Sequence, residues 1–257
     1  MSIIKEMKAE NLKVKIYDTR QSMGKAASRE VAVRIKYLLG IKNEINMVFA
    51  AAPSQNEFLT ALIKYKGIDW TRVNAFHMDE YIGLDSSASQ GFGTFLKKMI
   101  FERVPFKSVN YLDGNASDSE SECLRYSLLL KESHIDIVCM GIGENGHIAF
   151  NDPHIASFDD SKLVKVVELD QKCRQQQVND GCFNIIDEVP THALALTIPV
   201  LMSSANVFCM VPSKTKAEAV YNTIKGKISE NCPASILKKH RNAILYVDVD
   251  SAIYILE

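Results

Sequence analysis

The sequence predicts one α/β domain of the doubly wound, Rossmann-like class, with a mostly parallel sheet of about seven strands. Apolar runs typical of strands alternate with amphipathic stretches typical of helices along nearly all of the 257 residues. Some of these runs are continuously apolar, as expected for strands that helices cover on both faces. No repeat, low-complexity tract or long linker interrupts the pattern, so a single domain over residues 1–257 is the simplest prediction.

The expected elements follow one another in order. Strands are predicted at 12–17, 45–52, 71–77, 135–141, 162–168, 206–211 and 242–248. Helices are predicted at 20–39, 54–66, 91–103, 118–133, 170–180, 214–225 and 233–240. In such sheets ligands bind beyond the carboxyl ends of the strands, so the polar residues at these ends are the candidates for function.

Composition argues against several classes of protein. The net charge is −1 and no basic cluster appears, which argues against nucleic-acid binding. The six cysteines form no CxxC pair, so neither a metal site nor a disulfide framework is expected. The N-terminal residues contain no apolar stretch long enough for a signal peptide or a membrane span. We therefore expect a cytoplasmic protein with no membrane partner.

A pair of carboxylates follows the strand predicted at 71–77. Asp79 and Glu80 are neighbours, so their side chains point in opposite directions on an extended segment, and only one of them is expected to face a pocket. A positioned carboxylate is a common base for removing a proton next to a carbonyl or imine. On spacing alone, a solvated turn is the simpler interpretation.

The strand predicted at 135–141 leads into GIGENGHIAFNDP, residues 141–153. Its first six residues match the dinucleotide motif GxGxxG, but Asn151, Asp152 and Pro153 break the chain where that motif requires a long helix. We therefore expect no nicotinamide cofactor. The glycines bend the chain and present His147 beyond the sheet, with Asn145 and Asp152 as candidates to orient its ring. A structural histidine bonded to backbone would give the same sequence pattern.

Two further segments resemble anion sites. Ala51-Ala52-Pro53-Ser54-Gln55 combines small residues with a proline suited to begin a helix, and helix starts offer free N–H groups to phosphate. Lys214 and Lys216 lie in a first helical turn, where the helix dipole disfavours cations unless an anion binds. Lysines that point into water explain the second segment equally well, and Arg174 alone is typical of a solvated helix arginine.

Taken together, these segments resemble the glucosamine-6-phosphate deaminase/isomerase family, whose superfamily includes the 6-phosphogluconolactonases. The resemblance runs from about residue 20 to 250, and GIGENGHIAFNDP with the upstream FHMDEYIGL is its most specific part. Weaker matches are CRQQQ around residue 174, THALALTIPVL at 191–201 and KTKAEAV around residue 216.

The resemblance implies a role for each candidate residue. Asp79 matches the aspartate that shuttles a proton between C2 and C1, and His147 matches the histidine that assists ring opening. Asp152 matches an acidic partner of that histidine. Ser54, Arg174 and Lys216 match the residues that hold the substrate phosphate. No metal or organic cofactor is implied, and the expected partner is a small sugar phosphate, with a homo-oligomer left open.

The chain also departs from the family pattern. Asn145 stands where some members have aspartate, and the loop at 51–55 lacks the common Thr-Gly-Gly-Thr-Pro. The altered loop leaves galactosamine 6-phosphate open as the substrate. No basic allosteric site maps onto 154–165. Two competing functions are a 6-phosphogluconolactonase-type hydrolase, disfavoured by Tyr81 and Phe150, and a non-catalytic sugar-phosphate sensor, for which no DNA-binding module is present.

Overall fold

The main sheet contains eight strands among residues 3–256, which are the residues that the computed structural model describes. Its spatial order is β1-β2-β11-β10-β7-β3-β4-β6, and every pair of neighbours is parallel except β1 with β2. The strands are β1 (Ile3–Ala9), β2 (Leu12–Tyr17), β3 (Ile45–Phe49), β4 (Val73–His77), β6 (Ser108–Asn110), β7 (Ile137–Met140), β10 (Asn206–Val211) and β11 (Ala243–Asp248). The predicted doubly wound, mostly parallel sheet is confirmed.

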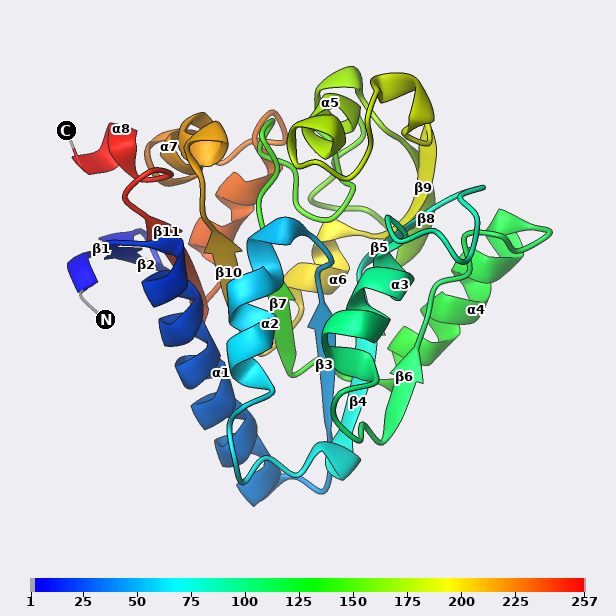
Figure 1. Cartoon of the computed structure of the whole chain (residues 1–257), viewed down its shortest axis with the longest axis horizontal. Helices are drawn as coiled ribbons and strands as arrows, with labels where there is room; N and C mark the ends of the chain where they lie inside the picture. Colours follow the sequence, from blue (N-terminus) through cyan, green and yellow to red (C-terminus); the bar gives the residue numbers. More distant parts are fainter. Residues whose placement is uncertain (1–2, 257) are drawn as a thin grey trace.

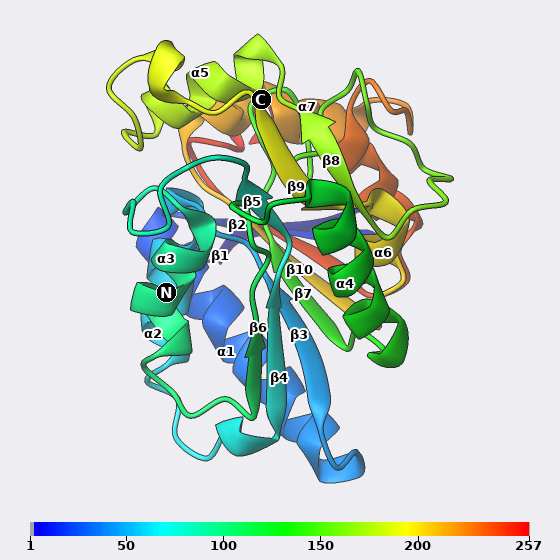
Figure 2. The same ribbon diagram turned by 90° about the vertical axis from the view of Figure 1, so that its right-hand side faces the viewer.

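Helices cover both faces of this sheet (Figure 2). One face carries α1 (Arg20–Ile41), α2 (Asn56–Leu62) and α3 (Phe92–Leu96), and the other carries α4 (Ser119–Glu132), α6 (Ile198–Met202), α7 (Ala217–Lys225) and α8 (Ile253–Leu256). Successive residues of a strand point to opposite faces. Accordingly, Met47 and Phe49 join the apolar cluster under α1 to α3, whereas Val48 joins the cluster on the opposite face.

Short helical turns complete the predicted helices. The helix predicted at 54–66 begins with the 3₁₀ turn Pro53–Gln55, and the one at 214–225 begins with the turn Lys214–Lys216. The one at 233–240 is entirely 3₁₀ (Pro233–Lys239), and α3 continues as the π-helical segment Lys97–Phe101. Two further 3₁₀ turns are Trp70–Arg72 and Ile186–Glu188.

The strand predicted at 162–168 belongs to a second sheet, which corrects its expected place in the main one. This small antiparallel sheet has the order β5-β9-β8, from β5 (Asp79–Tyr81), β9 (His192–Leu196) and β8 (Val164–Glu168). Together with α5 (Gln171–Asn179), it lies beyond the carboxyl ends of the parallel strands (Figure 1). Asp79 is therefore the first residue of a short strand of this second sheet, not part of a solvated turn after the strand predicted at 71–77.

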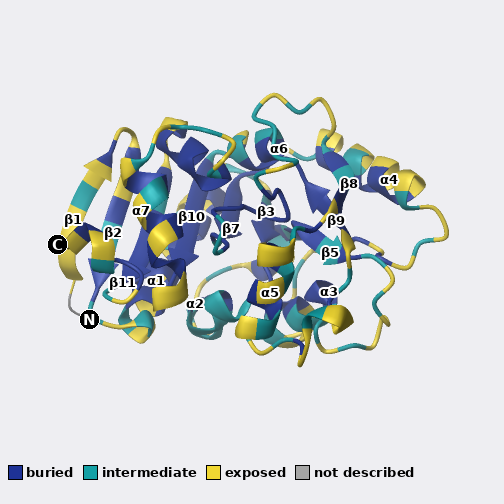
Figure 3. Cartoon of the chain, turned by 90° about the horizontal axis from the view of Figure 1, so that it is seen from above, coloured by how far each residue is buried: buried dark blue, intermediate teal, exposed yellow. Residues whose placement is uncertain are grey.

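Four strands were not predicted, β1, β5, β6 and β9, and the first three of them lack the usual signals. β1 (IIKEMKA) is an edge strand with mostly exposed residues, visible at one end of the sheet in Figure 3. β5 and β6 have three residues each, too few to show a period. Among the described residues, no helix is long and apolar enough to cross a membrane.

The strand order places a crevice between two neighbouring strands. From β3 the chain continues to β4 on one side, and from β7 it continues to the strands β10 and β11 on the other. Loops that leave adjacent parallel strands in opposite directions open a gap at their carboxyl ends. The loops after β3 and β7 contain two of the segments expected to carry function, 51–55 and 141–153.

Candidate active site

A cleft of about 290 Å³ lies at this gap. Most of the residues predicted for the site line it: Ser54, Asp79, His147 and Lys216. They come from the loops after β3, β7 and β10 and from the first residue of β5. Arg20, Gln176, Gln177, Asn179 and Asp180 also line the cleft, and none of them was among the residues proposed from the sequence.

Asp79 and Glu80 point in opposite directions, as their positions on a strand predict. Asp79 is 6% exposed and lines the cleft. The Glu80 carboxylate accepts hydrogen bonds from the backbone N–H groups of Phe92 (3.0 Å) and Gly93 (2.7 Å), at the start of α3. Burial raises the pKa of the Asp79 carboxyl well above its ordinary range, the charge of Glu80 raises it further, and the Phe150 N–H lowers it. A raised pKa makes the ionised Asp79 a stronger base than an exposed aspartate.

His77 fixes the backbone that carries Asp79. Its Nδ1 lies 3.0 Å from the Asp79 carbonyl oxygen, and its Nε2 accepts a hydrogen bond from the Leu112 N–H at 2.8 Å. Because Nε2 is the acceptor, Nδ1 carries the hydrogen and donates it to Asp79. Burial lowers the pKa of His77 to about 4, so the ring is neutral at pH 7. His77 was not predicted as a site residue, although it belongs to the same motif, FHMDEYIGL.

The glycine-rich segment lets the backbone pass close to the His147 ring. Gly146 has φ +85°, a conformation that side chains rarely adopt. An added Cβ at Gly143 would lie 2.1 Å from Cε1 of the imidazole, so only glycine allows the ring to lie against this backbone. The predicted tight bend is confirmed, with His147 buried at the cleft wall.

Hydrogen bonds set the orientation of the His147 ring. The Asn145 Oδ1 accepts from the His147 backbone N–H at 3.0 Å and lies 2.7 Å from the ring Nδ1. The Asn145 Nδ2 donates to Asp152 at 2.8 Å and to Asp170 at 2.9 Å, which fixes the amide in this orientation. With Asp152 Oδ1 also 3.1 Å from Nδ1, that nitrogen faces two acceptor oxygens and carries the hydrogen. In the neutral ring, Nε2 is left as the acceptor.

Asp152 is the buried carboxylate of this network. Burial alone would raise its pKa, but hydrogen bonds from His147, Asn145 and the Asp170 N–H outweigh burial and lower it. Asp152 therefore stays ionised and favours the Nδ1–H form of His147. The expectation that Asn145 and Asp152 flank the histidine is met by their positions. Asp170, which also caps α5 through the Cys173 N–H, was not foreseen.

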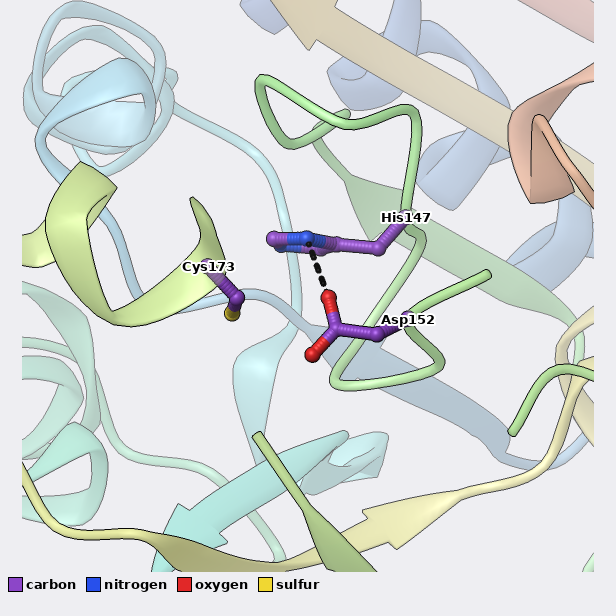
Figure 4. A group of neighbouring side chains, drawn as sticks. All are labelled: His147, Asp152 and Cys173. Carbon is purple, nitrogen blue, oxygen red and sulfur yellow. Dashed lines mark ion pairs between the residues drawn. The ribbon is translucent and has the colours of Figure 1, made fainter. Parts of the chain in front are cut away.

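Cys173 lies beside this pair (Figure 4), so His147, Asp152 and Cys173 are close enough together to be considered as metal ligands. The donor atoms are already in use, however. The His147 Nδ1 faces Asn145 and Asp152, and both Asp152 oxygens accept hydrogen bonds from Asn145 or the Asp170 N–H. Burial and the neighbouring carboxylates raise the pKa of the Cys173 thiol, which disfavours the thiolate that binds metals. The expectation of a reaction without a metal therefore stays our prediction.

Ser54 and Lys216 also line the cleft. The Gln55 side chain donates to the Ser54 Oγ at 3.1 Å and to the Met140 carbonyl at 3.3 Å, which ties the loop after β3 to the end of β7. Because its oxygen accepts this bond, the Ser54 hydroxyl hydrogen is free to point into the cleft. Lys216 is 4% exposed, and its ammonium has no hydrogen-bond partner among the described residues. Burial lowers the pKa of this ammonium, while Asp180 and Glu144 raise it.

Arg174 does not lie in the cleft, which corrects its predicted place in the site. Its guanidinium donates to the backbone carbonyls of Ile186 at 2.8 Å and Val189 at 2.9 Å. The side chain leaves α5 on the side away from the cleft and fixes the turn Ile186–Glu188 before β9. Sequence similarity around CRQQQ located the helix correctly, but a helix exposes different faces to different neighbours.

Comparison with known proteins shows the family of this chain. The model of the family described as glucosamine-6-phosphate isomerases/6-phosphogluconolactonase matches residues 18–246. The chain belongs to this family. Among its relatives, the glucosamine-6-phosphate deaminase of Clostridium acetobutylicum is 33% identical over 94% of this chain and 99% of that protein. The one from Listeria welshimeri is 36% identical over 81% of this chain and 87% of that protein.

Solved structures of this family share the fold. A structure of a monomeric glucosamine-6-phosphate deaminase superposes with a TM-score of 0.85 at 30% identity, covering 96% of this chain and 99% of that one. The 6-phosphogluconolactonase of Thermotoga maritima superposes with a TM-score of 0.75 at 19% identity, covering 92% and 99% of the two chains. The second similarity shows the common fold alone.

Proposed function

We propose that this enzyme converts glucosamine 6-phosphate and water into fructose 6-phosphate and ammonia. One observation carries the proposal: a buried carboxylate with a raised pKa, an oriented histidine and a buried unpartnered ammonium line the same cleft. The relatives that are 33–36% identical over most of the chain are named glucosamine-6-phosphate deaminases, which supports this reaction.

Ring opening is assigned to His147. Its Nε2, the acceptor nitrogen of the neutral ring, takes the proton of the anomeric hydroxyl and delivers it to the ring oxygen as the C1–O5 bond breaks. The product is an open-chain aldehyde with the amino group on C2. Asn145 and Asp152 keep the proton on Nδ1, so the basic nitrogen faces the substrate.

Proton transfer is assigned to Asp79. The ionised carboxylate removes the proton from C2 while the aldehyde oxygen at C1 takes a proton from solvent, which gives an enolamine with a C1–C2 double bond. The Asp79 carboxyl then returns its proton to C1, and the amino group releases a proton to solvent to become the C2 imine. The C2 imine then adds water and loses ammonia, leaving the ketose 6-phosphate. Ser54 and Lys216 hold the phosphate, so binding energy from a distant part of the substrate positions C1 and C2 near Asp79.

Competing substrates place different demands on the same cleft. Galactosamine 6-phosphate differs only at C4. A 6-phosphogluconolactonase would use the histidine to activate water and would not require Asp79 as a carbon base. The likeness to lactonases at 19% identity supports the fold, whereas the named deaminases support the proton-transfer chemistry. Six free cysteines fit action in the reducing cytoplasm.

Parallel assays test this function. Ammonia release is measured from glucosamine 6-phosphate, galactosamine 6-phosphate and N-acetylglucosamine 6-phosphate, and acid release from 6-phosphogluconolactone. We expect ammonia from glucosamine 6-phosphate, with fructose 6-phosphate in equal amount, and none from the N-acetylated sugar. Hydrolysis of the lactone without ammonia from either amino sugar would contradict the proposal.

A further inference from the structure

A phosphate bound in the cleft needs a second cation besides Lys216. A phosphate monoester carries a charge of about −1.5 to −2 at pH 7, so one ammonium leaves much of it unbalanced. Arg174 is bound to backbone carbonyls outside the cleft. Among the described residues, Arg20 and Lys216 are the lysine and arginine side chains that line the cleft.

Arg20 reaches the cleft from a different part of the chain. It is the first residue of α1 and follows the carboxyl end of β2, a parallel strand of the main sheet. Its Nε lies 2.7 Å from Glu57, and its Nη2 donates to Glu57 and to the Pro53 carbonyl, both at 3.0 Å. Pro53 and Glu57 flank Ser54 on the chain, so these contacts fix the guanidinium beside the predicted phosphate loop.

The packing of α1 against α2 makes this arrangement possible. An added Cβ at Gly24 would lie 2.5 Å from the Glu57 Cβ, so glycine lets the two helices approach closely here. Glu57 thereby comes within reach of Arg20 one helical turn earlier. The hydrogen bonds use Nη2, and Nε is within ion-pair distance of Glu57 without a hydrogen bond, so the guanidinium is anchored at Nη2 and has donors to spare.

We infer that Arg20 binds the phosphate of the substrate, together with Ser54 and Lys216. A guanidinium presents five N–H donors in a fixed plane, so Arg20 can donate to the phosphate while its Nη2 stays bound to Glu57 and Pro53, whereas a lysine has three donors on one rotating ammonium. Glu57 and Pro53 hold that plane in place before the ligand arrives. The inference rests on the proposed function for the identity of the sugar, but not for the presence of a phosphate.

Binding of a non-reacting ligand tests this inference without requiring turnover. Calorimetric titration of the full chain uses glucitol 6-phosphate, an open-chain sugar phosphate that cannot be deaminated, with glucitol and inorganic phosphate as comparison ligands. Arg20→Met removes the charge and keeps a long side chain, and Arg20→Lys keeps the charge without the planar fork. Arg174→Lys, outside the cleft, is the control.

The expected loss of glucitol 6-phosphate affinity is about tenfold to a hundredfold for Arg20→Met, as for charged hydrogen bonds generally. It should be smaller for Arg20→Lys and absent for Arg174→Lys, with thermal unfolding confirming that each variant folds. A folded Arg20→Met that binds glucitol 6-phosphate like the wild type would overturn the inference, as would an equal loss in Arg174→Lys. If no amino sugar is deaminated while affinity still depends on Arg20, the proposed function fails and this inference stands.

Discussion

His147 and Lys216 line the same cleft, but their polar groups are hydrogen-bonded in opposite ways. Around His147, Asn145, Asp152 and Asp170 form a closed network of hydrogen bonds. By contrast, the Lys216 ammonium is buried without a hydrogen-bond partner among residues 3–256. A satisfied network fixes geometry and tautomer before substrate binds, whereas an unsatisfied buried cation gains its partner from the ligand. In the proposed function, this difference separates the residues assigned to the reaction from the residues assigned to phosphate binding.

The largest expected effect is the loss of kcat on substitution of Asp79. Asp79→Asn removes the base and keeps nearly the same shape, so kcat should fall by about a hundredfold to ten-thousandfold while substrate affinity changes little. The matched control is Glu80→Gln, because the Glu80 carboxylate is bound to the start of α3. Its effect should be on stability, measured by urea unfolding. A larger kcat loss in Glu80→Gln than in Asp79→Asn would contradict the assignment.

Acid should lower the free energy of unfolding through protonation of His77. The pKa of this histidine is about 4 when folded and 6.5 ordinarily. The unfolded chain therefore binds an extra proton between these pH values, and stability present above pH 6.5 is lost as pH falls toward 4. At pH 4 the loss approaches about 3 kcal/mol. Urea unfolding at several pH values should show this slope reduced in His77→Asn and unchanged in the exposed control His192→Asn.

Substitution of Lys216 should weaken substrate binding. Lys216→Met should raise KM for the sugar phosphate by about tenfold to a hundredfold. Lys214→Met, two residues earlier and exposed, should change KM little. Steady-state kinetics with phosphorylated and unphosphorylated glucosamine measure the effect, since the variant should also lose preference for the phosphorylated sugar. Equal effects of the two lysine substitutions would show that Lys216 is no phosphate ligand.

A smaller effect is expected from exchanging a donor and an acceptor in the His147 network. Asn145→Asp places a third carboxylate beside Asp152 and Asp170 and removes two hydrogen bonds, so kcat should fall by roughly tenfold. The second change, Asp170→Asn, returns an amide donor to the cluster. A double-mutant cycle should show that the pair recovers part of the loss. Additive losses in the double variant would argue against direct coupling.

How far the sequence predicts this molecule depends on the range of each signal. The alternation of apolar runs predicted the doubly wound sheet, because burial on both faces leaves a pattern in every strand. β5 and β6 are too short for such a pattern, and the polar edge strand β1 has little burial. The strand at 164–168 was placed in the wrong sheet because pairing partners are distant in sequence.

The site was predicted where motif and position agree. The segment 141–153 brings His147, Asn145 and Asp152 together through local bonds, and the tight bend at Gly146 is visible in the sequence. Arg174 was misplaced because its partners, the carbonyls of Ile186 and Val189, follow a turn that no motif encodes. Arg20 was overlooked, although it follows the end of a predicted strand and the same rule applies to it.

Solvent deuterium exchange tests most directly the proposal that Asp79 transfers the proton and Lys216 binds the substrate. The sugar phosphates are recovered after incubation in deuterated water, and deuterium at C1 and C2 is measured for the wild type, Asp79→Asn and Lys216→Met. The account predicts exchange in the wild type, almost none in Asp79→Asn at any substrate concentration, and recovery toward the wild-type rate in Lys216→Met as substrate is raised. Wild-type exchange by a folded Asp79→Asn would contradict the central claim that this carboxylate moves the proton.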